Sequence, residues 1–298
     1  MLLQSCEKSK QMKKIKELPK TGIVVPSFNQ GKYIEKAIRS ILENAEHCPI
    51  KLIIMDGGST DETLDIVRRY SDKIHYWQSK PDGGQAAAIN AGIELLSDCE
   101  IVTWLNSDDE YENDWSVYTI VCAMQESGAQ VAYGRSYLMD KDSNVTGEYP
   151  VCAETAYERL SVDCCLSQPS VFIRKAAWDK AGGLNAKLQM CLDYDMWIRL
   201  SREYPFTYVD AVIGNTRIYD QTKTSQCQDR HLLEGIYILN QHYGLVPRPW
   251  VSEKYVRDKF GGNPITFLQK IYKRIDFMLR YEKIKTACIM EAERVINR

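Results

Sequence analysis

The 298-residue sequence lacks several features that would place it in a common class of protein. No stretch approaches 18 uninterrupted apolar residues, so we expect no membrane-spanning helix. No secretory hydrophobic region opens the chain, because residues 1–20 contain six lysines and only short apolar pieces. The ten cysteines are scattered without a C-x-x-C pair, which indicates free thiols in a reducing compartment. The sequence therefore predicts a cytoplasmic protein.

Strong net charge and the common phosphate-binding motifs are also missing. A net charge of −2 argues against a nucleic-acid partner. No G-x-G-x-x-G follows an expected strand and no G-x-x-x-x-G-K-[ST] occurs, which excludes the dinucleotide fingerprint and the P-loop. Apolar residues make up 44% of the chain, which is ample for a folded core.

From residue 21 onward, short apolar runs alternate with helical patterns. The expected strands cover residues 23–25, 52–55, 74–77 and 101–105. The expected helices cover residues 32–43, a segment starting near 59–62, and residues 84–96 and 114–126. Such alternation predicts βαβ units, hence an α/β fold with a Rossmann-like, mainly parallel central sheet flanked by helices. Ligands bind to this architecture beyond the carboxyl ends of the strands.

Small, acidic or turn-forming residues follow each of the four expected strands. The four turns are Pro26-Ser27-Phe28-Asn29, Asp56-Gly57-Gly58-Ser59, Lys80-Pro81-Asp82-Gly83-Gly84-Gln85 and Asn106-Ser107-Asp108-Asp109. Any single turn of this kind is common between a strand and a helix, but four at one edge of a sheet indicate a binding site. Carboxylates hold a diphosphate only through a divalent cation, so the pattern predicts a metal-bridged nucleotide site. The alternative for Asp108 and Asp109 is an acidic helix N-terminus favoured by the helix dipole.

Five motifs in this order resemble glycosyltransferase family 2, whose members have the GT-A fold. They are IVVPSFNQGKYIEKAIRSIL, DGGSTDET, KPDGGQAAAINAG, WLNSDD and LDYDMWIRL, and they lie between about residue 21 and residue 224. The resemblance implies an inverting, metal-dependent transfer of a sugar from a nucleotide-diphosphate sugar, with a UDP-sugar as the expected donor. The implied acceptor is a hydroxyl of a glycan or a lipid-linked molecule in bacterial cell-surface polysaccharide synthesis. A non-catalytic nucleotide-sugar-binding partner with the same fold is the alternative.

The resemblance also implies which residues bind the donor. The expected contacts to the nucleoside and its surroundings are Pro26, Ser27, Asn29, Asp56, Asp82, Gln85 and Asn90. Asn106 stands where the family often has Asp, which leaves Asp108 and Asp109 to hold the sugar and Mg²⁺ or Mn²⁺ between them. Which of the two carboxylates takes which role stays open. Arg217 and the nearby Lys223 lie where relatives close a loop over the diphosphate, although solvated surface positions explain both equally well.

The general base implied by the resemblance is Asp193. Asp195 and Arg199 are spaced i,i+4 on an expected helix and can pair, which gives Asp195 a structural explanation. Asp193 is not satisfied by that pair, and it occupies the family's base position, although Leu192 stands where many relatives have Glu. Trp178 and Trp197 could stack on a sugar, but packing in the core is the commoner role of tryptophan.

The sequence divides into a basic N-terminal tail (1–20), a GT-A domain (21–245) and a basic amphipathic helical extension (246–298). In the extension, residues 267–289 have apolar side chains every three or four positions with lysine and arginine between them. This pattern fits a helix lying peripherally on the inner face of the plasma membrane. It also fits a helix packed on the catalytic domain or on a second copy in a homodimer, and packing is the slightly favoured alternative.

Overall fold

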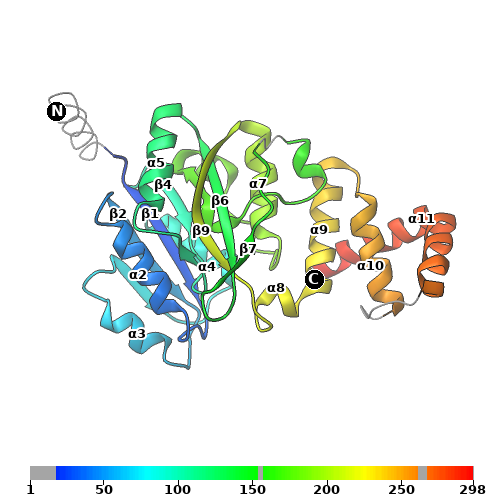
Figure 1. Ribbon diagram of the computed structural model, residues 1–298, viewed down its shortest axis with the longest axis horizontal. Coiled ribbons are helices and arrows are strands. Elements are labelled where there is room, and N and C mark those ends of the chain that lie inside the picture. The colour runs from blue at the N-terminus through cyan, green and yellow to red at the C-terminus, as the bar shows by residue number, and fades with distance from the viewer. Residues whose placement is uncertain (1–17, 154–156, 261–266, 298) are drawn as a thin grey trace.

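The computed structural model describes residues 18–153, 157–260 and 267–297, arranged as one sheet with helices and a helical extension (Figure 1). Most of the predicted basic tail, residues 1–17, lies outside the described residues. Within them, nine strands form a single sheet in the order β3-β2-β1-β4-β8-β6-β9-β5, with β7 paired to β6.

The first half of the sheet is parallel, as the alternating pattern predicts. It contains β1 (Thr21–Ser27), β2 (Ile50–Asp56), β3 (Tyr76–Ser79) and β4 (Ile101–Trp104). Its connecting helices are α2 (Ile34–Asn44), α3 (Thr63–Arg69) and α4 (Gln85–Glu94). Four parallel strands therefore deliver their following turns to one edge of the sheet, as β-α units must.

Helices on both faces explain why β1 reads as a continuous apolar run. All seven residues of this strand are buried. Val24 packs into the core on one side of the sheet, while its neighbours Ile23 and Val25 pack into the core on the other side. Successive side chains of a strand point to opposite faces, so a strand covered on both faces has no polar alternation.

The second half of the sheet mixes strand directions. Its strands are β5 (Glu110–Tyr111), β6 (Val131–Met139), β7 (Val145–Glu148), β8 (Val171–Arg174) and β9 (Phe206–Arg217), accompanied by α5 (Ser116–Ser127), α6 (Lys175–Ala181) and α7 (Leu192–Glu203). Strand β8 is antiparallel to β4 and β6, and β9 runs parallel to β6. The end of β9 pairs with β5, with Glu110 opposite Asn215. This pairing brings the turn that follows β4 beside the end of β9.

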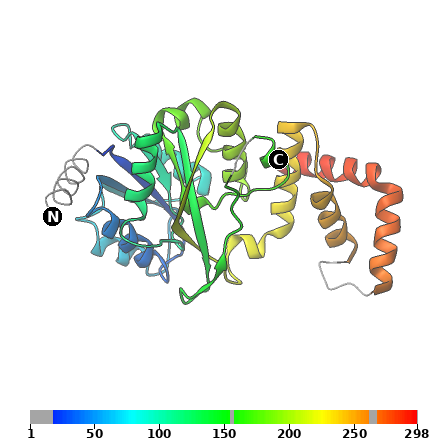
Figure 2. The ribbon, with the colours of Figure 1, turned by 45° about the horizontal axis from the view of Figure 1, so that its top comes forward.

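The chain ends in α8 (Lys223–Gln226), α9 (Gln228–Tyr243), α10 (Arg248–Phe260) and α11 (Phe267–Ile296). Helix α9 belongs to two cores: Ile238 and Leu239 pack with the sheet domain, while Ile236 packs with Val251 of α10 and Ala292 of α11. The predicted boundary at residue 245 therefore falls directly after a helix that both parts share. Figures 1 and 2 show α10 and α11 at the end of the molecule far from β1. No helix among the described residues is long and apolar enough to cross a membrane.

Candidate active site

A cleft of about 730 Å³ lies at the edge of the sheet where the turns after the parallel strands meet. It brings together most of the residues singled out in the sequence. The predicted residues that line it are Pro26, Ser27, Asp82, Gln85, Asn106, Asp108, Asp109, Asp193, Arg217 and Lys223. Turns more than 150 residues apart in sequence therefore face one cavity.

Three predicted donor-binding residues do not line the cleft and instead hold its turns. The Asp56 carboxylate is 1% exposed and accepts backbone N–H groups of Gly58 and Ser59 at 3.0 and 2.8 Å. The Asn29 side-chain oxygen accepts the Thr60 N–H at 2.9 Å. The side chain of Asn90 makes two hydrogen bonds, each 2.8 Å long, to the backbone of Leu184. A direct contact of these three side chains with a nucleotide stays a prediction.

An aromatic ring at the cleft was not singled out from the sequence. Phe28 is 60% exposed and lines the cavity beside Pro26 and Asp82. Large apolar side chains at such exposure are typical of binding surfaces when they lie in a concave site. The sequence placed Phe28 in the first turn but gave no sign that its ring is exposed.

The two acids after β4 have different surroundings. The Asp108 side chain accepts one hydrogen bond, from the Tyr219 hydroxyl, at 3.3 Å. Asp109 is 3% exposed, and both its oxygens are engaged: Oδ1 accepts the Arg217 backbone N–H at 2.8 Å and Oδ2 accepts the Asn106 amide at 3.0 Å. Asn106 in turn accepts the Gln85 amide at 2.8 Å. The hydrogen bonds thus fix Asp109 and leave Asp108 available to the cleft.

Burial raises the pKa of Asp108, and burial raises the pKa of Asp109 well above its usual range, with the Asp108 charge adding to the increase. Two carboxylates in this situation are stabilised as anions by a cation. Among the described residues no group of three or more His, Cys, Asp or Glu side chains could hold a metal by itself. Proteins usually bind Mg²⁺ through one or two carboxylates, and substrate phosphates and water supply the remaining ligands. The turn Asn106-Ser107-Asp108-Asp109, here called the acidic turn, fits that arrangement.

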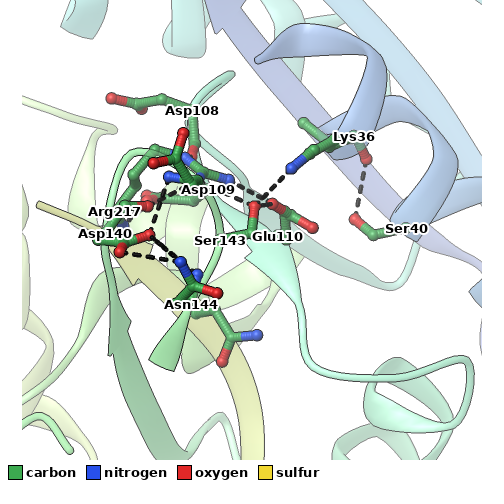
Figure 3. A network of polar contacts seen from close by, with 12 residues as sticks. Lys36, Ser40, Asp108, Asp109, Glu110, Asp140, Ser143, Asn144 and Arg217 are labelled. Atoms are coloured by element: carbon green, nitrogen blue, oxygen red, sulfur yellow. Dashed lines mark hydrogen bonds and ion pairs between the residues drawn. The ribbon is translucent and has the colours of Figure 1, made fainter. Parts of the chain in front are cut away.

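The Arg217 guanidinium is fully buried in a polar network that Figure 3 shows. It donates to the carbonyl oxygens of Asp108 and Asp140, each at 2.8 Å, and to Ser143 Oγ at 3.0 Å. It also forms an ion pair with Glu110. These contacts join the acidic turn to the β6–β7 hairpin, and in this arrangement they occupy the guanidinium that the family resemblance assigned to the diphosphate.

Lys223 is the second predicted cation of this region, and it lies across the cleft. Its Nζ atom is 3.3 Å from Oε1 of Gln85, the residue that opens α4. The side chain is exposed and lines the cavity. Lys223 can therefore approach an anion bound in the cleft without breaking a buried network.

Asp193 and Asp195 lie in the first turn of α7 and have opposite environments. Asp195 is paired with Arg199 at 2.9 Å, as the i,i+4 spacing predicts, and with His242 at 2.8 Å. Asp193 lines the cleft and accepts only the adjacent backbone N–H of Tyr194, at 2.8 Å. Burial raises the pKa of Asp193 to about 6. A partly buried carboxylate without a cationic partner suits proton transfer near neutral pH.

The two tryptophans considered as sugar-stacking residues are core residues. Trp178 is 4% exposed and Trp197 is 0% exposed. Both rings pack against Trp104 of β4, at centroid distances of 5.9 and 5.6 Å. Neither ring is available to a ligand, so the core-packing alternative is the one that the structure supports.

Comparison with known proteins relates the first part of the sheet domain to a family. Residues 22–159 match the model for "Glycosyl transferase family 2". This part of the chain, somewhat less than half of it, is similar to family 2 glycosyltransferase domains. Over 230 residues the chain is 24% identical to the chondroitin synthase of Pasteurella multocida (strain Pm70), and the match covers 76% of the chain and 23% of that protein. It is 27% identical over 221 residues to an uncharacterized glycosyltransferase of Rickettsia typhi, covering 70% of the chain and 66% of the relative.

Solved structures confirm the predicted GT-A fold of the chain. S. aureus TarS 1–349 in complex with UDP-GlcNAc superposes with a TM-score of 0.61 at 14% identity, covering 93% of this chain and 90% of that one. The mannosyltransferase PcManGT of Pyrobaculum calidifontis, in complex with GDP-Man and Mn²⁺, gives a TM-score of 0.58 at 13% identity, covering 94% and 86%. The chain spans less than two thirds of the length of the two curated relatives described above.

Proposed function

We propose that this glycosyltransferase is inverting and metal-dependent and uses a nucleotide-diphosphate sugar, with UDP-sugars as the first candidates. The observation that carries the proposal is that Asp108 and Asp193, each with a single side-chain hydrogen bond, face the same cleft. The acceptor is a hydroxyl of a glycan or of a lipid-linked molecule. The similarity to a chondroitin synthase supports cell-surface polysaccharide as the product.

The order of the strands supports a direction for the donor along the cleft. The turns after β1 and β3 contribute Ser27, Phe28 and Asp82, and we assign the nucleoside to them. The turn after β4 contributes Asp108, so the diphosphate belongs there, with Lys223 as its cationic contact in place of Arg217. TarS binds UDP-GlcNAc and PcManGT binds GDP-Man, which supports a diphosphate donor of this kind.

We propose Asp108 as the ligand of the divalent cation and Asp109 as the residue that orients the turn. The PcManGT complex with Mn²⁺ supports the use of such an ion in this fold. Mg²⁺ or Mn²⁺ bound there would neutralise the charge of the departing diphosphate. Arg217 contributes by holding the backbone on which Asp108 sits, since its guanidinium donates to the Asp108 carbonyl.

Asp193 is the proposed general base. Its carboxylate accepts the proton of the acceptor hydroxyl while the oxygen of that hydroxyl attacks the anomeric carbon. The bond from this carbon to the diphosphate oxygen breaks on the opposite face, and the diphosphate leaves with the electron pair. A single displacement of this kind inverts the anomeric centre.

The metal requirement is tested by measuring nucleoside diphosphate release from UDP-glucose, UDP-GlcNAc, UDP-glucuronate and GDP-mannose with Mn²⁺. We expect release from at least one donor, because water can replace the acceptor slowly, and loss of that release in EDTA. Excess Mn²⁺ added after EDTA should restore it, which controls for damage by the chelator. Turnover that persists in EDTA would contradict metal dependence, and donor binding without turnover would favour the non-catalytic alternative.

We further propose that α11 contacts an anionic membrane on its cytoplasmic face. Its outward side exposes Ile275, Met278 and Leu279, by 51%, 69% and 76%. Arg274 and Lys283 are exposed on the same helix. An apolar stripe flanked by basic side chains suits the interface of a membrane with negatively charged lipids.

Flotation with vesicles tests this membrane contact. We expect the protein to float with vesicles of 30% phosphatidylglycerol in phosphatidylcholine and to stay behind with pure phosphatidylcholine. Leu279→Glu should abolish flotation, whereas Val145→Glu, at a residue that is 56% exposed on the distant β7, should not. A Leu279-dependent dimer in size-exclusion chromatography, without flotation, would instead identify this face as a homodimer interface.

A further inference from the structure

Glu234 of α9 is a charged residue with no exposed surface in the part of the chain that the structure describes. Its carboxylate accepts three consecutive backbone N–H groups, those of Gln189, Met190 and Cys191, at 2.8 to 3.0 Å. Arg230, one turn earlier on α9, adds an ion pair at 2.6 Å. A buried carboxylate is costly unless its oxygens are satisfied in this way.

The segment that Glu234 holds leads directly into the catalytic helix. Cys191 is the N-cap of α7, and Asp193 lies in the first turn of that helix. Gln189, Met190 and Asp193 all line the cleft. The position of the Asp193 carboxylate therefore depends on the backbone of residues 189–191. That backbone is held by Glu234 of α9, which lies 41 residues after Asp193 in the chain.

A second contact joins the same two segments. The Cys191 thiol lies 3.5 Å from the backbone oxygen of His231, also on α9. Asp193 has no comparable tether of its own, since its side chain accepts only the N–H of the next residue. The orientation of the base thus comes from the segment before it.

We propose that Glu234 is a positioning residue for sugar transfer, which fixes residues 189–191 and thereby holds Asp193 at the cleft. This inference rests on the proposed role of Asp193 as the general base. The charge of Glu234 also raises the pKa of Asp193, in addition to the larger effect of burial. Glu234 therefore supports the base by geometry and by electrostatics without contacting substrate.

The test compares Glu234→Gln with Glu203→Gln. Glu203 ends α7, is 52% exposed and pairs with Lys180 on the surface, so its replacement is a matched loss of one carboxylate. The measurements are the rate of UDP release from the most active UDP-sugar with Mn²⁺, its dependence on pH, and the dissociation constant of UDP with Mn²⁺. We expect Glu234→Gln to lower the rate about 10- to 100-fold through misplacement of the base, with UDP affinity changed less than about 2-fold.

The pH dependence separates positioning from general damage. The rate should rise with pH as Asp193 loses its proton, and we call this rising part of the rate profile the acidic limb. Removing the negative charge of Glu234 should move the acidic limb to lower pH, because the pKa of Asp193 falls when a nearby anion is lost. Glu203→Gln should change neither the rate nor the limb. If Glu234→Gln does not fold, Glu234→Asp, which keeps the charge on a shorter side chain, should lower the rate without moving the limb.

An unchanged rate and limb in folded Glu234→Gln would overturn the proposal, as would a loss of UDP binding that parallels the loss of rate. The activity of Asp193→Asn distinguishes a failure of the positioning role of Glu234 from a failure of the general-base role of Asp193. If Asp193→Asn is inactive and Glu234→Gln is fully active, only the positioning role fails. If Asp193→Asn is fully active, the general-base role of Asp193 fails, and the positioning role of Glu234 fails with it.

Discussion

Replacing Asp193 by asparagine should lower turnover by about 10²- to 10⁴-fold, which is the usual contribution of a positioned general base. The amide has nearly the same shape as the carboxylate but cannot accept the proton of the acceptor hydroxyl. Donor binding should stay nearly unchanged, because Asp193 lies on α7, whereas the nucleotide is assigned to the turns after β1, β3 and β4. The measurement is the rate of nucleoside diphosphate release, together with calorimetric binding of UDP and Mn²⁺.

The pH profile adds a second readout of the same variant. Burial raises the pKa of Asp193 to about 6, so the base is protonated and inactive below that pH and active above it. The wild-type rate should therefore rise with pH and level off above about pH 7, and this acidic limb should be absent from the residual rate of the Asn variant. Asp179→Asn, at a 56% exposed position on α6, is the control. A full rate in Asp193→Asn would assign the base to another group.

Replacing Arg217 by methionine should cost about 3–5 kcal/mol of folding free energy, the range for removing one partner of a buried charge network. The guanidinium is fully buried, and its loss leaves Glu110 without its ion pair and the Asp108 carbonyl oxygen without the donor it has here. The Asp140 carbonyl oxygen loses one of its two donors and keeps the Ser143 N–H at 3.1 Å. Urea unfolding followed by circular dichroism measures the loss. Metal-dependent donor binding should weaken as well, because the acidic turn loses its anchor.

Arg39→Met is the matched control for that variant. Arg39 is 64% exposed, and its ion pair with Glu43 spans 3.7 Å. Exposed pairs of this kind contribute at most about 1 kcal/mol. If Arg217→Met unfolds at the same urea concentration as wild type but no longer binds donor, the guanidinium contacts the diphosphate directly, as the family resemblance suggested.

The parallel half of the fold could be predicted because its determinants are local. Continuous apolar runs such as residues 23–25 and turn residues such as Asp56 mark the strands and the ends at which ligands bind. The half with mixed strand directions could not, because the place of β8 between β4 and β6 depends on contacts between distant segments. Its apolar residues show no period that distinguishes the two directions.

The candidate site shows the same difference between residues marked by local sequence and residues placed by contacts between distant segments. Asp108 and Asp109 stand out in the sequence because they follow the expected strand 101–105, whereas the role of Asp193 was implied by the resemblance to glycosyltransferase family 2. The burial of Arg217 could not be predicted, since it follows from the pairing of β9 with β5 across about 100 residues. Glu234 was not found at all, because a glutamate on an amphipathic helix looks the same in sequence whether its carboxylate meets water or three backbone N–H groups.

Calorimetric titration of UDP in the presence and absence of Mn²⁺ tests the central claim most directly, on wild type and on the Asp108→Asn, Asp109→Asn double variant. A double variant of exposed acids outside the cleft, Asp114→Asn with Asp142→Asn, is the control. We expect Mn²⁺ to strengthen UDP binding to wild type and to the control by about 10-fold or more, or about 1.4 kcal/mol. This gain should disappear in the cleft variant while the protein remains folded. UDP affinity that does not depend on Mn²⁺, or a gain retained without both carboxylates, would contradict the assignment of this turn to a metal-bridged diphosphate.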